Sequence, residues 1–299
     1  MPITHLFGNG MPALNSKIKL YFFLILSQYT YSNHYILTSP AYNPGFFSVF
    51  NTVLGCLQDF DQGLFQGLTI DFQDKGLYYD PLYGPNWWHY YFEPINISNT
   101  NSGQTTVKKF PLYKKIIFAF QSQFDIDRQE GYFLIGKYIH LTSHIQDQIS
   151  NFVREHFKDS YVIGVHYRGT DKVSEAPAVT YELVAKEVNK AIEAYHGSDY
   201  KIFVATDDGL FFKYMVGMFP NKVCGIDTYR SEDGTPVHIQ KNNNYKKGQD
   251  ALLDCILLSK TDLIIKCASN LSDTSLKFNP NIPVIHLNTS YSERTIYEV

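Results

Sequence analysis

The C-terminal half of the chain alternates short apolar segments with amphipathic ones, and this alternation limits the fold more than any other feature of the sequence. Apolar strands are predicted at residues 161–167, 201–206, 223–227, 262–266 and 283–287. Helices are predicted at residues 181–195, 210–219 and 248–259, and another opens at Ser269-Asn270. Strands that alternate with helices pair in parallel through right-handed crossovers. The sequence therefore predicts an α/β fold.

The N-terminal half begins in the same way. A strand at residues 34–38, a helix at 46–59 and a strand at 68–72 predict a second parallel sheet. The chain has 299 residues, which is enough for two α/β domains of ordinary size. We expect an N-terminal domain at residues 1–157, ending with a helix at 143–157, and a C-terminal domain at 158–299. Polar loops are expected at residues 99–109 and 229–247.

Charge and cysteine content exclude several classes of protein. The net charge is -3 and there is no arginine-rich block, which argues against nucleic-acid binding. The four cysteines lack zinc spacing and sit in apolar runs, so buried free thiols and a cytoplasmic location are expected. The alternative is export, because two lysines precede a short apolar run in a signal-like segment at residues 17–27. That run is too short to span a bilayer stably.

Polar residues gather where the predicted strands end. In open α/β sheets, ligands bind at the carboxyl ends of the strands. This rule selects four places: residues 43–48, residues 166–175, the pair Asp207-Asp208 and the pair Ser269-Asn270. No G-x-G-x-x-G follows a strand and no Walker P-loop is present, so a dinucleotide oxidoreductase is weakly supported.

Each of these places has a functional and a structural interpretation. Arg168 suits a bidentate grip on phosphate, or it pairs with Asp171 to hold the loop. Asp207 and Asp208 could bind a divalent metal or a ligand, or Asp208 could cap the next helix.

The last two candidates lie on predicted helices. Ser269-Asn270 could offer backbone N–H groups to an anion or serve as a helix N-cap. Asp254 interrupts an apolar helix, which is unusual for a carboxylate that does not face a polar ligand or partner.

The heptapeptide HYRGTDK at residues 166–172 resembles the H-x-R-R-T-D-K motif of the alpha-1,6-fucosyltransferases and nodulation fucosyltransferases, relatives of the protein O-fucosyltransferases. Two further blocks follow in order. The ATDD at residues 205–208 is similar to a strand end of that family, and residues 248–270 are similar to its last donor-binding block. The resemblance covers roughly residues 161–287. The N-terminal half matches loosely, at the turn 44–46.

The resemblance implies a GT-B fold, with two Rossmann-like domains that face a cleft. It implies an inverting, metal-independent transfer of fucose from GDP-fucose to a glycan or other hydroxyl acceptor, without a cofactor. The donor-binding residues that it implies are His166 and Asp254 at the guanine base or ribose, Arg168 at the diphosphate, Ser269 and Asn270 at phosphate, and Asp207, Asp208, Gly45 and Phe46 around the donor.

The catalytic residues that it implies are Arg168, Lys172 and Glu175, of which the last two assist the acceptor hydroxyl. Asp171 is the alternative base, or a structural residue of the loop. Two departures matter: Gly169 replaces the second arginine of the motif, and Glu175 arrives one position early. They keep two alternatives open, namely another nucleotide-sugar donor and a protein that binds nucleotide sugars or glycans without catalysis.

Both tryptophans lie in the aromatic segment at residues 87–91. This segment could form a platform for the acceptor or a buried cluster of the N-terminal core. We favour the buried cluster.

Overall fold

The computed structural model describes residues 33–39, 44–98, 106–111, 126–169, 176–237 and 243–289. Its N-terminal sheet has the strand order β3-β2-β1-β4. The strands are β1 (Asn33–Thr38), β2 (Gly67–Ile70), β3 (Asn96–Ser98) and β4 (Thr106–Pro111). Strand β1 pairs in parallel with β2 and β4, whereas β3 runs antiparallel to β2. The predicted βαβ unit at the start of the chain is confirmed.

The second sheet has the order β7-β6-β5-β8-β9, and every pairing in it is parallel. Its strands are β5 (Tyr161–Tyr167), β6 (Tyr200–Thr206), β7 (Val223–Cys224), β8 (Leu263–Lys266) and β9 (Val284–His286). Chain order reverses between β5 and β8. The connections from these two strands leave in opposite directions, which creates a crevice at their carboxyl ends.

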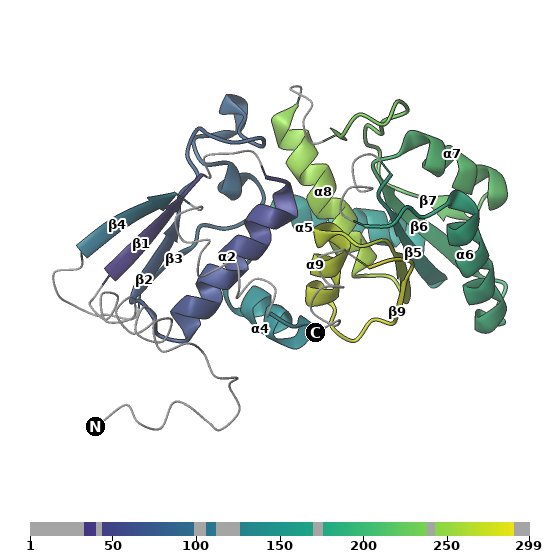
Figure 1. The fold of residues 1–299 in the computed structure, drawn as a ribbon, viewed down its shortest axis with the longest axis horizontal. Coiled ribbons are helices and arrows are strands. Elements are labelled where there is room, and N and C mark those ends of the chain that lie inside the picture. The colour runs from purple at the N-terminus through teal and green to yellow at the C-terminus, as the bar shows by residue number, and fades with distance from the viewer. Residues whose placement is uncertain are drawn as a thin grey trace, which may run out of the picture.

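Helices pack against the inner face of the N-terminal sheet and against both faces of the second sheet (Figure 1). They are α2 (Phe46–Asp61), α4 (Arg128–Tyr138), α5 (Ser143–Phe152), α6 (Tyr181–Tyr195), α7 (Gly209–Met218), α8 (Asn244–Leu258) and α9 (Asn270–Phe278). Two 3₁₀ turns, η1 (Pro81–Tyr83) and η2 (Trp87–Tyr90), and a π-helical turn, η3 (Val153–Phe157), complete the elements. Helices α6 and α7 lie on the outer face of the second sheet, and α2, α8 and α9 lie between the two sheets (Figure 1).

One continuous core joins the two sheets. The apolar side chains of α2, such as Phe50, Val53 and Leu57, are fully buried and belong to the same cluster as Leu252 and Leu257 of α8. Each such side chain stabilises the fold by about 1.5–3 kcal/mol relative to an exposed one. The relative placement of the two sheets is therefore fixed by packing. The domain boundary near residue 157 stays a prediction.

The aromatic segment belongs to the core. Trp87 and Trp88 are 2% and 0% exposed. Trp87 stacks on Phe72 at 4.8 Å, and Trp88 lies 4.3 Å from Phe92, ring centroid to ring centroid. The prediction of a buried cluster is confirmed. A platform formed by the two tryptophans is ruled out, because neither ring has a free face.

Strand β4 corrects the sequence analysis, which expected a polar loop across residues 99–109. Backbone pairing with β1 holds residues 106–111 in the sheet despite their polar composition. Helix α8 begins at Asn244, before the predicted start at residue 248, because the Asn243 side chain caps it by accepting a hydrogen bond from the backbone N–H of Lys246 at 3.3 Å. Helix α4 and strand β3 were not predicted. The signal-like segment at residues 17–27 lies outside the described residues.

Two further predictions from the sequence concern the cysteines and membrane-spanning segments. Cys56, Cys255 and Cys267 are buried free thiols, as predicted, and Cys224 is partly buried. Among the described residues, no helix has the length and apolar character needed to cross a membrane.

Candidate functional site

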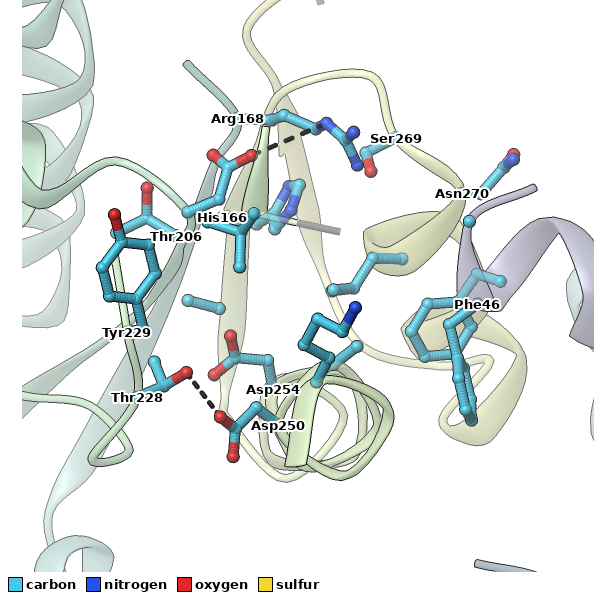
Figure 2. Close-up of a pocket in the computed structure, with 18 of the residues that line it drawn as sticks. Phe46, His166, Arg168, Thr206, Thr228, Tyr229, Asp250, Asp254, Ser269 and Asn270 are labelled. Atoms are coloured by element: carbon cyan, nitrogen blue, oxygen red, sulfur yellow. Dashed lines mark hydrogen bonds and ion pairs between the residues drawn. The ribbon is translucent and has the colours of Figure 1, made fainter. Parts of the chain in front are cut away.

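A cavity of about 760 Å³ lies at the carboxyl ends of β5 and β6 and against the first turns of α2 and α9. Cavities of roughly 300–1,000 Å³ are typical of sites for small molecules and cofactors. The predicted donor-binding residues that line it are Gly45, Phe46, His166, Arg168, Asp207, Asp254, Ser269 and Asn270. Figure 2 shows Arg168 and Ser269 on one side of the cavity and Asp250 and Asp254 on the opposite side.

Arg168 is the cation at the end of β5. Its Nε lies 3.9 Å from Oδ2 of Asp207, and the Arg168 side chain is 29% exposed. The Asp207 carboxylate also accepts a hydrogen bond from the backbone N–H of Gly169 at 3.3 Å. Asp207 thus orients the loop that carries the guanidinium. The alternative pairing of Arg168 with Asp171 is not described, because residues 170–175 lie outside the described part of the chain.

Helices α2 and α9 begin at the cavity, and the N-cap and first turn of α8 also line it. Ser269 occupies the N-cap position of α9 with extended backbone, and its hydroxyl makes no capping hydrogen bond. Gly45 occupies the same position of α2 and has no side chain to cap with. Neither N-cap side chain therefore caps the first N–H groups of its helix. Helix N-termini carry a partial positive charge and bind anions through these N–H groups.

Asp254 is the carboxylate that the sequence analysis singled out. It is 7% exposed and lines the cavity, and its Oδ1 has no hydrogen-bond partner among the described residues. Burial raises the pKa of this carboxyl well above its usual range, although the guanidinium of Arg230 opposes the shift. A buried carboxylate oxygen without a partner costs free energy, so a ligand that donates a hydrogen bond to it would bind favourably.

Asp250 lies one turn before Asp254 on the same face of α8 and also lines the cavity. Its Oδ2 accepts a hydrogen bond from the hydroxyl of Thr228 at 2.6 Å, and both carboxylate oxygens accept from Lys246 Nζ at 2.9 and 3.0 Å. Both oxygens of Asp250 are therefore hydrogen-bonded within the protein, whereas Oδ1 of Asp254 has no partner among the described residues.

Asp208 is not among the residues that line the cavity, and its role in shaping the donor site stays a prediction. It is the N-cap of α7, where its Oδ1 accepts from the backbone N–H of Phe211 at 2.9 Å. Its Oδ2 accepts from the hydroxyl of Tyr181 at 2.6 Å. The capping alternative is confirmed. Among the described residues, no three His, Cys, Asp or Glu side chains are grouped so that they could hold a metal ion.

The glycine in the heptapeptide is packed closely. A Cβ on Gly169 would lie 2.5 Å from Asp208 Oδ2 and 2.8 Å from Cε1 of Tyr167. Both neighbours are held, Asp208 as a helix cap and Tyr167 by a hydrogen bond from its hydroxyl to the carbonyl of Val179. An arginine at this position would displace them, so the departure from the motif is built into the local packing.

The structure adds residues to the cavity that the sequence analysis missed, among them Tyr78, Thr228, Tyr229, Lys246, Lys247 and Asp250. Lys246 and Asp250 could have been found from the sequence, because they are spaced four residues apart on the same helical face as Asp254. Tyr78 and Tyr229 lie on segments without regular secondary structure, where no periodic spacing points to the cavity. The predicted Asp171, Lys172 and Glu175 lie outside the described residues, and their roles stay predictions.

Comparison with solved structures identifies the fold. A fucosyltransferase NodZ from Bradyrhizobium is 17% identical with a TM-score of 0.57, and the match covers 86% of this chain and 96% of that one. A NodZ alpha-1,6-fucosyltransferase soaked with GDP-fucose is 18% identical with a TM-score of 0.52, over 83% of this chain and 93% of that one. The same enzyme co-crystallized with GDP is 19% identical with a TM-score of 0.54, over 86% and 95%. The chain therefore has a GT-B fold, as expected.

Comparison with curated protein sequences finds no match. The family model Nodulation protein Z (NodZ) matches residues 123–291, which is more than half of the chain. The match includes the ends of β5 and β6, helix α8 and the start of α9, which together carry most of the cavity. The chain belongs to the NodZ family.

Proposed function

We propose that this protein is a glycosyltransferase that transfers fucose from GDP-fucose to a hydroxyl group of a glycan or another acceptor. One observation carries the proposal: a cation, the starts of two helices and a buried carboxylate with an unpartnered oxygen all line one cavity, with the cation and the carboxylate on opposite sides (Figure 2). A nucleoside diphosphate sugar has matching chemistry, with an anionic diphosphate and a base that donates hydrogen bonds. Related NodZ structures were obtained with GDP-fucose and with GDP.

The diphosphate is assigned to Arg168 and the starts of α2 and α9. When the bond from the sugar to the diphosphate breaks, negative charge grows on the leaving oxygen. A guanidinium and backbone N–H groups that already point at this oxygen stabilise the charge without reorganisation. In this assignment Ser269 and Asn270 contact phosphate from one side, and Gly45 and Phe46 approach it from the other.

The base is assigned to Asp254, with His166 nearby. The Watson–Crick edge of guanine presents a ring N–H and an exocyclic amino group, both donors, on adjacent atoms. A carboxylate only accepts hydrogen bonds, so it complements this edge. His166 is 4% exposed and lines the same cavity from β5, where it can contact the base or the ribose.

The transfer itself is proposed to invert the anomeric centre without a metal or cofactor. The acceptor oxygen attacks the anomeric carbon as the bond to the diphosphate breaks, and the acceptor proton passes to a base. Glu175 is the proposed base, Lys172 assists it, and Asp171 is the alternative. We also propose that residues 158–299 supply most of the donor site, that residues 1–157 supply the acceptor side together with the donor contacts of Gly45 and Phe46, and that the protein works in the cytoplasm.

Gly169 favours a second candidate, the transfer of another sugar from a GDP donor. The residue is a glycine, and its packing against Asp208 leaves no room for a second arginine at the diphosphate. The base and diphosphate contacts proposed above would be unchanged, and only the sugar would differ.

A thermal-shift titration with GDP, UDP, GDP-fucose and GDP-mannose in chelator, followed by a transfer assay, tests the proposal. A ligand that binds only the folded state raises the melting temperature. Stabilisation by GDP and GDP-fucose, and turnover with GDP-fucose, are expected. Turnover with GDP-mannose alone would support the second candidate. Stabilisation without turnover on any acceptor would indicate a binding protein, and stabilisation by UDP alone would contradict the assignment of Asp254.

A further inference from the structure

Tyr229 is an aromatic side chain on the wall of the cavity that the proposed function does not use. It lines the cavity and is 56% exposed. Figure 2 shows its ring beside Thr206, on the side of the cavity away from Phe46 and Asn270. Within the described part of the chain, its side chain makes no hydrogen bond and no ring contact. Because the ring lines the cavity without a protein partner, a ligand can pack against it.

The backbone that carries this exposed ring is held on both sides. Before it, Thr228 bonds to Asp250, and Lys246 Nζ donates to the carbonyl of Asp227 at 2.8 Å. After it, the guanidinium of Arg230 lies 4.0 Å from the centre of the Phe212 ring.

Further hydrogen bonds fix the same loop. Arg230 donates to the carbonyl of Ile226 at 3.0 Å, and the backbone N–H of Ser231 donates to the carbonyl of Asp207 at 2.8 Å. These contacts tie residues 226–231 to α8, to α7 and to the end of β6. Tyr229 is therefore an exposed ring on an anchored loop.

Such a ring is suited to stacking on a planar ligand. Tyrosine has few rotatable bonds, so fixing it on a ligand costs little conformational entropy, and an anchored backbone lowers that cost further. Thr228, the neighbour of Tyr229, is bonded to Asp250, one turn from Asp254 on α8. The ring and the unpartnered Asp254 oxygen both line this cavity. A nucleobase has a flat face for the ring and N–H groups on its edge for the carboxylate.

We propose that Tyr229 is the stacking surface for the nucleobase of the donor, while Asp254 contacts the edge of that base. This inference rests on the proposed function, because it assigns a residue to the base of the GDP moiety. The ring contributes affinity by stacking on the flat face of the base, and the carboxylate contributes specificity by accepting hydrogen bonds from its edge. Base stacking on an aromatic side chain changes affinity by about 5- to 150-fold when the aromatic residue is replaced by alanine.

Calorimetry with two probes tests the inference. The probes are GDP and ribose 5-diphosphate, which has the sugar and both phosphates but no base. We expect Tyr229→Ala to weaken GDP binding about 5- to 150-fold and to leave the affinity for ribose 5-diphosphate unchanged. Tyr229→Phe keeps the ring and should bind GDP like the wild type. Tyr132→Ala is the matched control, because Tyr132 is 53% exposed on α4 and does not line the cavity.

Each other outcome has a distinct meaning. Equal GDP affinity in Tyr229→Ala and the wild type overturns the inference and leaves the proposed function standing. An equal loss for both probes also overturns it, because the residue would then act on the phosphates or on the fold. A raised KM for the acceptor with unchanged GDP binding would assign the ring to the acceptor instead. Failure of the wild-type protein to bind GDP would refute the proposed function itself, and the inference with it.

Discussion

Replacing Asp254 by asparagine tests two effects of this side chain: the free energy that burying its charge costs the fold, and the affinity that its carboxylate adds for a nucleotide. The side chain is 7% exposed, and one of its oxygens has no partner among the described residues. Asparagine has nearly the same shape without the charge. The substitution should therefore weaken nucleotide binding and leave the unliganded fold no less stable.

The size of the binding effect follows from the hydrogen bonds that would be lost. Hydrogen bonds to a charged group contribute about 1.5–3 kcal/mol each, and 1.4 kcal/mol corresponds to tenfold in affinity. If the carboxylate binds the guanine edge, the Kd of GDP should rise about 10- to 150-fold in Asp254→Asn, measured by calorimetry. Asp147→Asn is the control, because Asp147 is exposed on α5 and lies outside the cavity.

The stability effect has a definite dependence on pH. Burial raises the pKa of Asp254 in the folded state above its value in the unfolded chain. The folded protein then holds the proton more tightly, so this carboxyl stabilises the fold at low pH, and that contribution is lost as pH rises through the folded-state pKa. Asparagine does not titrate. The melting temperature of Asp254→Asn relative to wild type, without ligand, should therefore increase from pH 5 to pH 8.

Two results would refute this reasoning. Unchanged GDP affinity in Asp254→Asn would show that the carboxylate does not contact the base. A variant that loses stability relative to wild type as pH rises would show that the ionised carboxylate is compensated by the protein, most directly by Arg230, whose guanidinium acts on the same carboxyl.

Four further predictions test the remaining assignments. Arg168→Ala should lower kcat about 100- to 1,000-fold in a transfer assay with an unchanged circular-dichroism spectrum, because a cation at the leaving diphosphate is lost; near-normal turnover would contradict its role. Asp208→Ala should cost about 0.5–2 kcal/mol in denaturant unfolding with GDP affinity unchanged, whereas Asp208→Asn keeps an oxygen for the cap and should be milder. Trp88→Ala should destabilise the fold by about 3–5 kcal/mol, and Trp88→Phe, which folds more readily, should keep the wild-type KM for the acceptor, as expected of a core residue. Turnover should persist in chelator, and restoration only by added manganese would return Asp207 to the role of a metal ligand.

The elements that could be predicted from the sequence are those in which periodicity and burial agree. Helix α6 begins and ends where its apolar spacing predicts, because Thr180 caps it and His196 adopts the left-handed conformation that ends it. Strand β4 was missed because its place in the sheet comes from backbone pairing with β1 and not from an apolar pattern. The early start of α8 depends on the cap at Asn243, which resembles an ordinary polar loop residue in the sequence.

Some residues of the candidate site could also be predicted from the sequence, and others could not. His166, Arg168, Asp207 and Ser269 meet at one cavity because the carboxyl ends of parallel strands share an edge, which is a consequence of topology and can be predicted. Asp208 follows Asp207 directly but turns away to cap α7, and adjacency in sequence does not separate the two roles. Tyr229 reaches the cavity because its loop is tied to α8, an arrangement of tertiary structure that leaves no local pattern.

The arrangement of positive charge explains how a site with one arginine at the heptapeptide could still support transfer. Each helix N-terminus acts as roughly half a positive charge, so α2 and α9 together supply about as much as one cation. These partial charges belong to the backbone and persist in any side-chain variant. GDP binding should therefore survive in Arg168→Ala with a moderate loss, while turnover falls steeply, because the lost cation would contribute most in the transition state, where negative charge grows on the leaving oxygen. Equal losses in GDP affinity and in kcat would show instead that Arg168 binds the ground state and the transition state alike.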